Sequence, residues 1–498
     1  MMPSLIHALL NHPGSFDHPV ENLQLIETHI SWVILTGAYA YKIKKPVNLG
    51  FLDFSTLEKR QQDCHEELRL NRRLAAEYYL DVVAITGSLD APQVGGSGRA
   101  IEYAVKMRQF PTDATLDRLA ERGELNEMHV DALAARLAHF HLYECEAAPV
   151  GSPWGEPEAI ARPVEENFRI LAGLLQGSSD RQSLAQLQAW SDAEHAHLAP
   201  LMRNRTVREC HGDLHLANVA WADGKPVIFD CLEFDPALRW IDAISEVAFC
   251  YMDLLHRDHA QLAWRFLNAW LSATGDYQGL ALLNYYAVYR ALVRAKVAGL
   301  RAAQVADALS VQSAHVDVSS CLKLAIRFTE KRQPELWITH GLSGSGKTTL
   351  SQALLEHRGM VRLRSDVERK REAGLEALAH GGERLYTRQA SRSTYGHLAE
   401  LASGLLAAGW PVIVDAAFLE RGQRDLFRNL AKRYEADFRI LDMAVDPHVL
   451  RARVRQRQKK GTDASDADLA VLERQLLSAQ PLEEDERVDT MPQLMPPH

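Results

Sequence analysis

The sequence predicts two folded parts in one chain: a bilobal α+β domain followed by an α/β domain with a parallel sheet. Three observations lead to this prediction. Segments rich in β-branched and aromatic residues occur mainly before Pro111, helical apolar spacing follows it, and beyond residue 335 short apolar segments alternate with helical ones. Alternation of strands and helices is typical of a parallel sheet. A chain of 498 residues has enough material for two to four domains.

The amino-terminal lobe is predicted to be mainly β-structure. Residues 26–44 contain two strand candidates joined by a turn at Thr36 and Gly37, and residues 57–79 have helical apolar spacing with many charges. Two further strand segments, 82–89 and 93–110, enclose a glycine-rich hairpin. The expected order is therefore strands, one helix, and strands again.

Helices are predicted for most of the chain between Pro111 and the second domain. The clearest helical patterns cover residues 130–144 and 282–303. We expect a first domain over residues 1–328, with lobes of about 1–110 and 111–328, and a charged linker containing Pro334 over residues 329–334. The second domain is expected over 335–490, and a flexible tail over 491–498.

Composition and charge are those of an ordinary folded, soluble protein. Apolar residues make up 47% of the chain and charged residues 24%. A net charge of -9 and a pI near 6.2 argue against a protein whose whole surface binds nucleic acid. The six cysteines are scattered without a C-x-x-C pair, which indicates neither a zinc site nor a disulfide framework. Reduced thiols in a cytoplasmic protein fit best.

No membrane segment is predicted. The amino terminus lacks a basic start followed by a long apolar core, so a secretory signal is not expected. The most membrane-like stretch, residues 401–419, contains Pro411 and Asp415. A buried helix, a turn and a strand explain that stretch better than a membrane helix does.

The segment His211-Gly212-Asp213 carries the first chemical signal. Asn218 follows the aspartate by five residues, and the next strand candidate ends at Asp230. In phosphoryl transfer, a base must orient the attacking hydroxyl and accept its proton, while Mg²⁺ neutralises phosphate charge. Aspartate and asparagine oxygens are suitable Mg²⁺ ligands. These residues therefore supply a candidate base, a neutral metal ligand and an anionic metal ligand, in that order.

The motif pair "HGDLHLAN" and "VIFD" resembles the catalytic and metal-binding motifs of the aminoglycoside phosphotransferase and choline kinase group, which are relatives of protein kinases. The resemblance covers roughly residues 25–325. It implies Asp213 as the catalytic base, and Asn218 and Asp230 as Mg²⁺ ligands.

The same resemblance implies a lysine that contacts the ATP phosphates. Lys42 and Lys44 share one face of a predicted strand, and Lys42 is preferred. Its ionic partner is expected to be Glu66 or Glu67 in the following helix.

The first domain also departs from the kinase pattern. No G-x-G-x-x-G loop precedes the two lysines, and Gly37 is the only glycine in that hairpin. Two interpretations stay open: an active kinase site, or a degenerate kinase retained as a binding module. Glu233 and Asp235 follow the metal aspartate and either face a cationic substrate or form a solvated acidic loop.

The second chemical signal is "GLSGSGKT", residues 341–348, which matches the phosphate-binding motif G-x-x-x-x-G-K-[ST] between a strand and a helix candidate. Glycine backbone amides curl around phosphate, Lys347 reaches the β- and γ-phosphates, and Thr348 coordinates Mg²⁺. The expected ligand is ATP or GTP with Mg²⁺. The residues expected to bind it are Gly341, Ser343, Gly344, Ser345, Gly346, Lys347, Thr348 and Thr349.

The segment that follows this loop resembles P-loop kinases such as phage polynucleotide kinase, gluconate kinase and the zeta toxins. The resemblance spans residues 335 to about 485. It implies that Asp366 orients or deprotonates the acceptor hydroxyl, that Arg369 binds the acceptor, and that Asp415 holds the metal through water. The acidic pair usual in AAA motor ATPases is absent, which disfavours a hydrolysing motor.

A basic helical segment, residues 449–461, has three interpretations. By the same resemblance it is a lid whose Arg451 and Arg455 close over the transferred phosphate. A solvated basic helix face is the ordinary alternative. Binding of nucleic acid is a third, disfavoured because no aromatic residues are interleaved.

The two-part layout is similar to bacterial proteins labelled as bifunctional aminoglycoside phosphotransferase and ATP-binding protein. This resemblance implies a kinase that transfers the γ-phosphate of Mg-ATP to hydroxyl groups of small molecules at two sites. Two alternatives remain: a regulatory ATP-binding protein whose first domain is inactive, and a polynucleotide 5′-kinase in the second domain. The sequence specifies neither the acceptors nor the oligomeric state.

Overall fold

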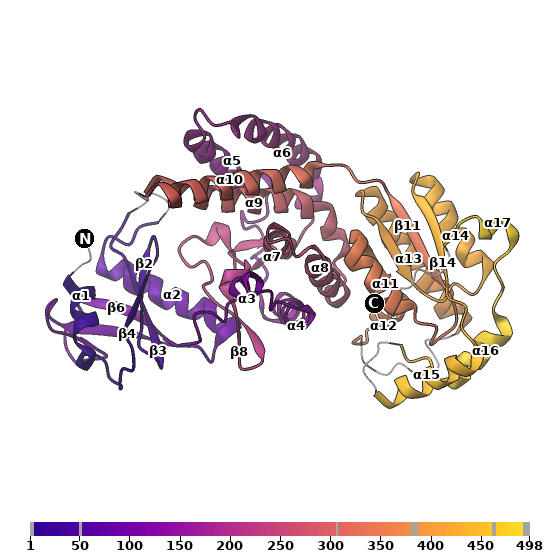
Figure 1. Ribbon diagram of the computed structural model, residues 1–498, viewed down its shortest axis with the longest axis horizontal. Coiled ribbons are helices and arrows are strands. Elements are labelled where there is room, and N and C mark those ends of the chain that lie inside the picture. Colours follow the sequence, from indigo (N-terminus) through magenta and orange to yellow (C-terminus); the bar gives the residue numbers. More distant parts are fainter. Residues whose placement is uncertain are drawn as a thin grey trace. The chain divides into compact units, whose positions relative to one another are not determined.

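A computed structural model describes residues 4–48, 52–304, 307–377, 379, 382, 387–460 and 465–491. The chain forms two compact units (Figure 1). The first unit contains residues 1–132, 139–167 and 197–253, and the second contains 133–138, 168–196 and 254–498. The second unit therefore joins the last helices of the predicted first domain to the whole predicted second domain.

The first unit contains a six-stranded antiparallel sheet with the order β1-β2-β3-β6-β4-β5. Alternation along β3 divides its side chains between the two faces. Tyr41 and Ile43 enter an apolar cluster with Ile34, while Lys42 and Lys44 project to the other face. The strands are β1 (Gln24–Glu27), β2 (Ser31–Leu35), β3 (Tyr39–Lys44), β4 (Tyr79–Gly87), β5 (Pro92–Val94) and β6 (Glu102–Arg108).

One long helix, α2 (Leu57–Ala75), packs on the lysine-bearing face of this sheet. It begins at Thr56, whose hydroxyl accepts a hydrogen bond from the Lys59 amide at 3.3 Å. Its apolar stripe, including Cys64 and Leu68, packs with Val105 of β6. The buried Glu67 lies on the same helix and is thereby directed toward β3.

The motif residues of the first unit lie on short elements that follow one another closely. β7 (Val207–Glu209) pairs with β10 (Trp240–Asp242), and β8 (Val219–Ala222) forms a hairpin with β9 (Lys225–Ile228). Further elements that lie wholly or partly in this unit are α1 (Ser4–Asn11), η1 (Pro13–Ser15), α3 (Leu116–Glu121), α4 (Glu127–His139), η2 (Phe140–Glu144), α5 (Pro157–Leu174), α6 (Arg181–Met202), η3 (Leu216–Asn218), η4 (Pro236–Leu238) and α7 (Ala243–His256).

The second unit contains the parallel sheet, with the order β12-β13-β11-β14-β15. Short apolar segments beyond residue 335 form four of these strands, as expected, and a two-residue strand is the fifth. Because the strands are parallel, their carboxyl ends meet at one edge, where ligands bind in such sheets. The strands are β11 (Glu335–His340), β12 (Val361–Arg364), β13 (Val412–Asp415), β14 (Asp437–Asp442) and β15 (Thr490–Met491).

Helices surround this sheet and continue into a helical layer within the same unit (Figure 1). α10 ends at Thr329 and β11 begins at Glu335, so the predicted linker joins these two elements. The helices are α8 (Ala260–Thr274), η5 (Tyr277–Gly279), α9 (Leu280–Gln304), α10 (Ala308–Thr329), α11 (Lys347–Leu354), η6 (Leu355–Gly359), α12 (Ser365–Glu372), α13 (Arg388–Ala407), α14 (Arg421–Arg433), α15 (Pro447–Lys460), α16 (Leu469–Ser478) and α17 (Glu484–Arg487).

Helix α8 covers the edge of the parallel sheet at β12. The Asn268 side chain donates to the carbonyl of Met360 at 3.0 Å and accepts from the amide of Arg362 at 2.7 Å. Both groups belong to the backbone at the start of the edge strand, which has no strand partner on that side in the described part of the chain. The indole of Trp410 donates to the carbonyl of Leu280 at 3.0 Å nearby. The sheet and the helical layer thus share buried polar contacts.

Two predictions concern the ends and the apolar stretches of the chain. Residues 401–419 contain the end of α13, a turn and β13, as expected. Among the helices that the structure describes, none is long and apolar enough to cross a membrane. The predicted flexible tail lies outside the described residues except for Met491, which belongs to β15.

Candidate active sites

The His211 ring holds the motif loop of the first unit in shape. Its Nδ1 accepts from the Asp213 amide at 3.2 Å, so Nε2 carries the proton and donates to the Phe229 carbonyl at 2.8 Å. Burial lowers the pKa of His211, although Glu246 opposes this effect. A neutral imidazole in one tautomer is therefore the form that fits the loop, and its role is structural.

Asp213 and Asn218 lie side by side after this turn. The Asn218 amide donates to the Asp213 carboxylate at 3.1 Å and to the Asp213 carbonyl at 2.9 Å. The His215 ring packs edge-on against Phe249, with ring centroids 5.4 Å apart. Its Nε2 also lies 3.4 Å from the Asp213 carboxylate. The Asp213 side chain remains one-third exposed, so a substrate hydroxyl has access to it.

Glu246 of α7 anchors the loop and was not found by sequence reasoning. One of its carboxylate oxygens accepts from the amides of His211 at 2.6 Å and Gly212 at 2.9 Å, and the other lies 2.7 Å from Nε2 of His141. Burial alone would raise the pKa of Glu246, but the His141 hydrogen bond and the backbone amides lower it to about 2. No local motif signals this residue, because it lies 33 positions after Asp213.

Lys42 connects the sheet, helix α2 and the segment that contains Asp230. Its Nζ lies 2.8 Å from Glu67 Oε1 and also forms an ion pair with Asp230. Burial alone would lower the pKa of Lys42, but these carboxylates raise it well above its ordinary value. Burial alone would raise the pKa of Asp230, but the adjacent Lys42 ammonium lowers it below its ordinary value. Both groups therefore stay charged at neutral pH.

Lys44 is fully buried beside a second set of carboxylates. Its Nζ lies 2.5 Å from Glu67 Oε2 and 2.9 Å from Asp63 Oδ2, and it pairs with Glu233. Burial and the charge of Glu67 raise the pKa of Glu233 to about 7, although Lys44 opposes them. Glu233 is therefore not part of a solvated acidic loop, because its side chain is buried against Lys44.

Two other acidic residues have roles unlike those expected for them. Glu66 points away from both lysines and pairs with Arg69 at 2.8 Å and Arg239 at 2.7 Å. Of the two proposed partners for Lys42, only Glu67 contacts it. Asp235 begins η4 by accepting from the Ala237 amide at 2.9 Å, which is a capping role.

The β2–β3 turn differs from a glycine-rich phosphate loop. Gly37 adopts a φ of 96°, and its amide donates to the Gln109 side chain at 3.0 Å. The turn borders a cavity of about 490 Å³ that is also lined by Ala38, Tyr39, Leu80, Arg108 and Gln109. Gln109 therefore occupies the amide of the one glycine in this hairpin.

The P-loop of the second unit borders a cavity of about 900 Å³. Of the predicted nucleotide-binding residues, Ser343, Gly344, Gly346, Lys347, Thr348 and Thr349 line it. Gly344 and Gly346 have φ angles of 84° and 96°, which other residues rarely adopt. Gly341 and Ser345 belong to the loop but do not line the cavity. The Gly341 amide donates to the Ala417 carbonyl at 3.1 Å.

Lys347 and Asp415 occupy the same cavity. The Lys347 ammonium donates to the carbonyls of Gly341 at 3.0 Å and Leu342 at 2.8 Å. Burial lowers the pKa of Lys347, and Asp415 partly opposes this effect. Asp415 ends β13 and accepts from the Ser351 hydroxyl at 3.2 Å. Its carboxylate and the Thr348 hydroxyl are oxygen donors that suit Mg²⁺.

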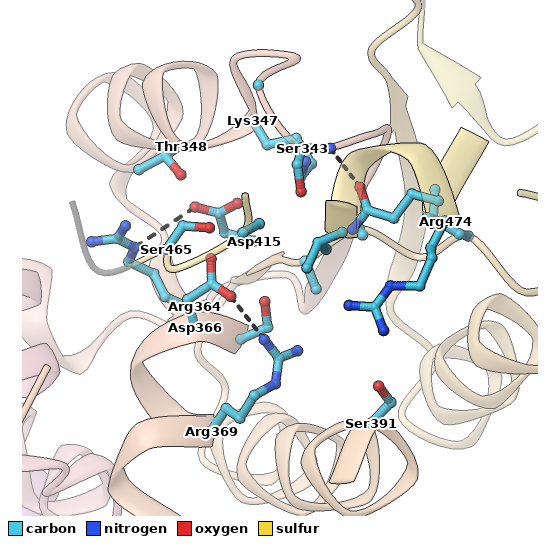
Figure 2. A pocket seen from close by; sticks show the side chains of 18 of the residues that line it. Ser343, Lys347, Thr348, Arg364, Asp366, Arg369, Ser391, Asp415, Ser465 and Arg474 are labelled. Atoms are coloured by element: carbon cyan, nitrogen blue, oxygen red, sulfur yellow. Dashed lines mark hydrogen bonds and ion pairs between the residues drawn. The ribbon is translucent and has the colours of Figure 1, made fainter. Parts of the chain in front are cut away.

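Asp366 and Arg369 lie together on α12, one helical turn apart (Figure 2). Arg369 donates to the Asp366 carboxylate at 2.9 Å, and both side chains line the cavity that contains Lys347. The cavity also includes Arg364, Arg388, Ser391 and Arg474, which sequence reasoning missed. Their positions follow from how the end of β12 meets α13 and α16 at the sheet edge, and no local motif encodes that arrangement.

The basic helix α15 contributes different arginines from those predicted. Arg453 and Arg457 line the cavity, and Arg453 donates to the Gly344 carbonyl at 3.3 Å. Arg451 instead pairs with Glu473 at 2.7 Å, and Arg455 is exposed outside the cavity lining. Two residues along a helix correspond to a rotation of about 200° about its axis. Arg451 and Arg455 therefore point to the side of α15 opposite to Arg453 and Arg457.

Two family models match separate stretches of the chain. Residues 51–283 match the phosphotransferase enzyme family, and residues 336–482 match an AAA domain family. Uncharacterized proteins of Mycobacterium tuberculosis and Mycobacterium bovis are 30% identical over 425 residues, which cover 83% of this chain and 82% of each relative.

Solved structures are similar to parts of the chain. An ethanolamine kinase of Plasmodium vivax covers 62% of this chain and 84% of its own, with 12% identity and a TM-score of 0.38. A gluconokinase of Sinorhizobium meliloti covers 32% of this chain and 82% of its own, with 21% identity and a TM-score of 0.23.

The two family matches follow one another along the chain, and the mycobacterial relatives cover both. The chain is an ATP-dependent kinase-type enzyme, and it belongs to the bacterial family in which an aminoglycoside-phosphotransferase-like kinase domain is fused to an AAA-type P-loop domain.

Proposed function

We propose that the chain has two kinase-type sites, each of which transfers the γ-phosphate of Mg-ATP to a hydroxyl group of a small molecule. One observation carries this proposal. In each unit separately, an accessible aspartate, a lysine and oxygen ligands suited to Mg²⁺ lie on neighbouring elements. Phosphoryl transfer depends mainly on such positioning and on charge stabilisation.

In the first site, Asp213 is the proposed base. Its carboxylate accepts the proton of the acceptor hydroxyl as the new O–P bond forms and the bond between the γ-phosphorus and the β-phosphate oxygen breaks. Lys42, held by Glu67, contacts the phosphates. Asn218 and Asp230 would hold Mg²⁺, which neutralises charge on the phosphates when bound.

In the second site, Lys347 and the P-loop amides hold the phosphates of ATP. Asp366 orients the acceptor hydroxyl and accepts its proton, and Thr348 and Asp415 would hold Mg²⁺. The common cavity lined by these side chains supports the assignment. Arg453 and Arg457 are proposed to approach the transferred phosphate from α15.

The test is transfer of γ-labelled phosphate from Mg-ATP into a metabolite extract by three proteins: wild type, Asp213→Asn and Lys347→Ala. We expect each substitution to remove a different labelled product, with a loss of about 10²-fold or more for the base substitution. A product lost only in Lys347→Ala would mean that the first domain binds without catalysing. Labelled 5′ ends of added RNA or DNA that depend on Lys347 would indicate a polynucleotide kinase instead.

A further inference from the structure

The cavity at the P-loop holds more positive charge than Mg-ATP requires. Among the residues that the structure describes, six arginines and Lys347 line it, against Asp366, Asp415 and Glu420. This excess occurs in a chain whose net charge is -9. Mg²⁺ offsets part of the triphosphate charge, which leaves about two negative charges on the nucleotide complex. About two positive charges in the cavity remain for another ligand.

These charges are divided between two parts of the cavity. Lys347 and Arg453 contact the carbonyls of the P-loop itself, so they belong to the nucleotide side. The guanidinium groups of Arg369 and Arg474 point toward one another across a different part of the cavity, with the hydroxyl of Ser391 beside them (Figure 2). They come from three elements, α12, α16 and α13, that converge on this one space.

We propose that this part of the cavity is an anion subsite, and that the acceptor of the second site is a hydroxyl compound carrying a carboxylate or a phosphate group. The inference rests on the proposed kinase function of this site. Two guanidinium groups and a hydroxyl match the acceptor oxygens of either group. Asp366, 2.9 Å from Arg369, then lies where the hydroxyl of an anchored acceptor would reach it.

The subsite also explains a feature of α12. Arg369 is largely buried, with 10% of its side chain exposed, and Asp366 is 26% exposed. The buried guanidinium fixes the position of the proposed base through its 2.9 Å hydrogen bond to the carboxylate. Binding of the acceptor anion would place a second negative group on the far side of the same guanidinium. The acceptor is thereby selected by charge before its hydroxyl meets the base.

The experiment uses the full-length protein saturated with Mg²⁺ and a non-hydrolysable ATP analogue. Inorganic phosphate and acetate are titrated separately, and binding is followed by NMR line broadening of each anion. We expect at least one anion to bind, and its affinity to fall about tenfold or more in Arg369→Gln combined with Arg474→Gln. Arg392→Gln, an exposed arginine of α13 outside the cavity, is the matched control and should bind like wild type.

The preferred anion distinguishes a phosphorylated acceptor from a carboxylated one. Equal affinity in the double variant and wild type, or no binding of either anion, overturns the subsite. Binding of the ATP analogue is measured in the same samples, and Lys347→Ala serves as the variant with a disrupted P-loop. If the analogue does not bind at the P-loop, the proposed function of this site is wrong, whereas a bound analogue without a bound anion removes only the present inference.

A turnover assay gives a second, independent readout. Matched acceptors with the same carbon chain are compared: a neutral polyol, its carboxylic acid and its phosphate ester. Products that depend on Lys347 should come from the charged members, and the double arginine variant should raise KM for them with a smaller effect on KM for ATP. Faster labelling of the neutral polyol than of both charged members would overturn the proposal.

Discussion

At the scale of single residues, Lys42 and Lys44 differ in what they hold, although they lie two positions apart on β3. Lys42 contacts Asp230, the proposed metal ligand, whose side chain is 45% exposed, so the Lys42 ammonium borders the site. Lys44 is fully enclosed by Asp63, Glu67 and Glu233. A buried charge of this kind is costly unless it is paired, so Lys44 acts as a positioning residue that joins α2 to the segment after Asp230.

We predict that Glu233 makes the first unit less stable as the pH rises. Its pKa is raised from 4.5 to about 7 in the folded protein, so between these values the folded state holds a proton that the unfolded state has lost. The free energy of unfolding therefore falls as pH rises through this window. In Glu233→Gln this decrease should be absent. Urea unfolding of wild type and Glu233→Gln at several pH values measures this decrease. If the free energy of unfolding changes with pH in the same way in both proteins, Glu233 is not the group responsible.

We predict that Glu246 supports catalysis through the backbone it holds. Glu246→Ala leaves the buried amides of His211 and Gly212 without their acceptor, which should cost about 2–4 kcal/mol of stability. Displacement of Asp213 should lower kcat for its product by on the order of 10²-fold, with little change in KM for ATP. Glu246→Gln retains one acceptor oxygen and should recover part of kcat. An equal loss of kcat in Glu246→Ala and Glu246→Gln would argue against a positioning role for Glu246.

The motif residues were predictable because the chain itself brings them close. Asp213 and Asn218 are five positions apart, and the β8–β9 hairpin returns the chain to Asp230. Glu246 and Glu233 were not predicted correctly, since their partners are set by packing between elements distant in sequence. A buried acidic residue and a solvated one look the same in a single sequence.

At the scale of elements, the phase of α15 decides which arginines serve the cavity. Sequence reasoning identified a basic helix at the right place but chose Arg451 and Arg455. Helical periodicity relates residues four apart and gives no absolute orientation. The orientation is set by Leu450 and Val454, which pack with Leu472 of α16 and turn Arg453 and Arg457 toward the P-loop.

This orientation leads to a prediction about two double substitutions. Arg453→Ala with Arg457→Ala should lower kcat of the Lys347-dependent reaction by about 10²-fold, because charge that stabilises the transferred phosphate is lost. Arg451→Ala with Arg455→Ala removes equal charge from the opposite side of the helix and should change kcat less than about threefold. Measuring kcat of both double variants tests this prediction. A larger loss of kcat in the Arg451 and Arg455 variant would support the assignment made from the sequence.

At the scale of the whole molecule, the second compact unit extends across the predicted linker. Sequence reasoning placed a boundary at residues 329–334, where charge and Pro334 interrupt the helical pattern. The second compact unit instead includes α8, α9 and α10 together with the parallel sheet. A linker motif marks where the chain leaves one element, and contacts such as Asn268 with β12 determine which elements fold together.

We predict that Asn268 stabilises the P-loop domain although it lies outside the matched AAA region. Asn268→Ala removes two buried hydrogen bonds to β12 and should lower the free energy of unfolding of the second unit by about 2–4 kcal/mol. Gln261→Ala is the control on the same helix, since its bond to His357 is exposed. Thermal unfolding with and without a bound nucleotide analogue identifies the transition of the second unit. Similar midpoint temperatures for Asn268→Ala and Gln261→Ala would exclude a specific contribution of Asn268 to its stability.

The cover that α8 gives to β12 also bears on how such a protein persists in a crowded cell and in evolution. An uncovered edge strand presents amides and carbonyls that pair with strands of other chains and promote aggregation. Asn268 occupies this edge with a single side chain. A gene split between the two domains would expose β12, so a free-standing descendant of the P-loop half would need a new cap, such as a charged or proline-bearing edge, to stay monomeric.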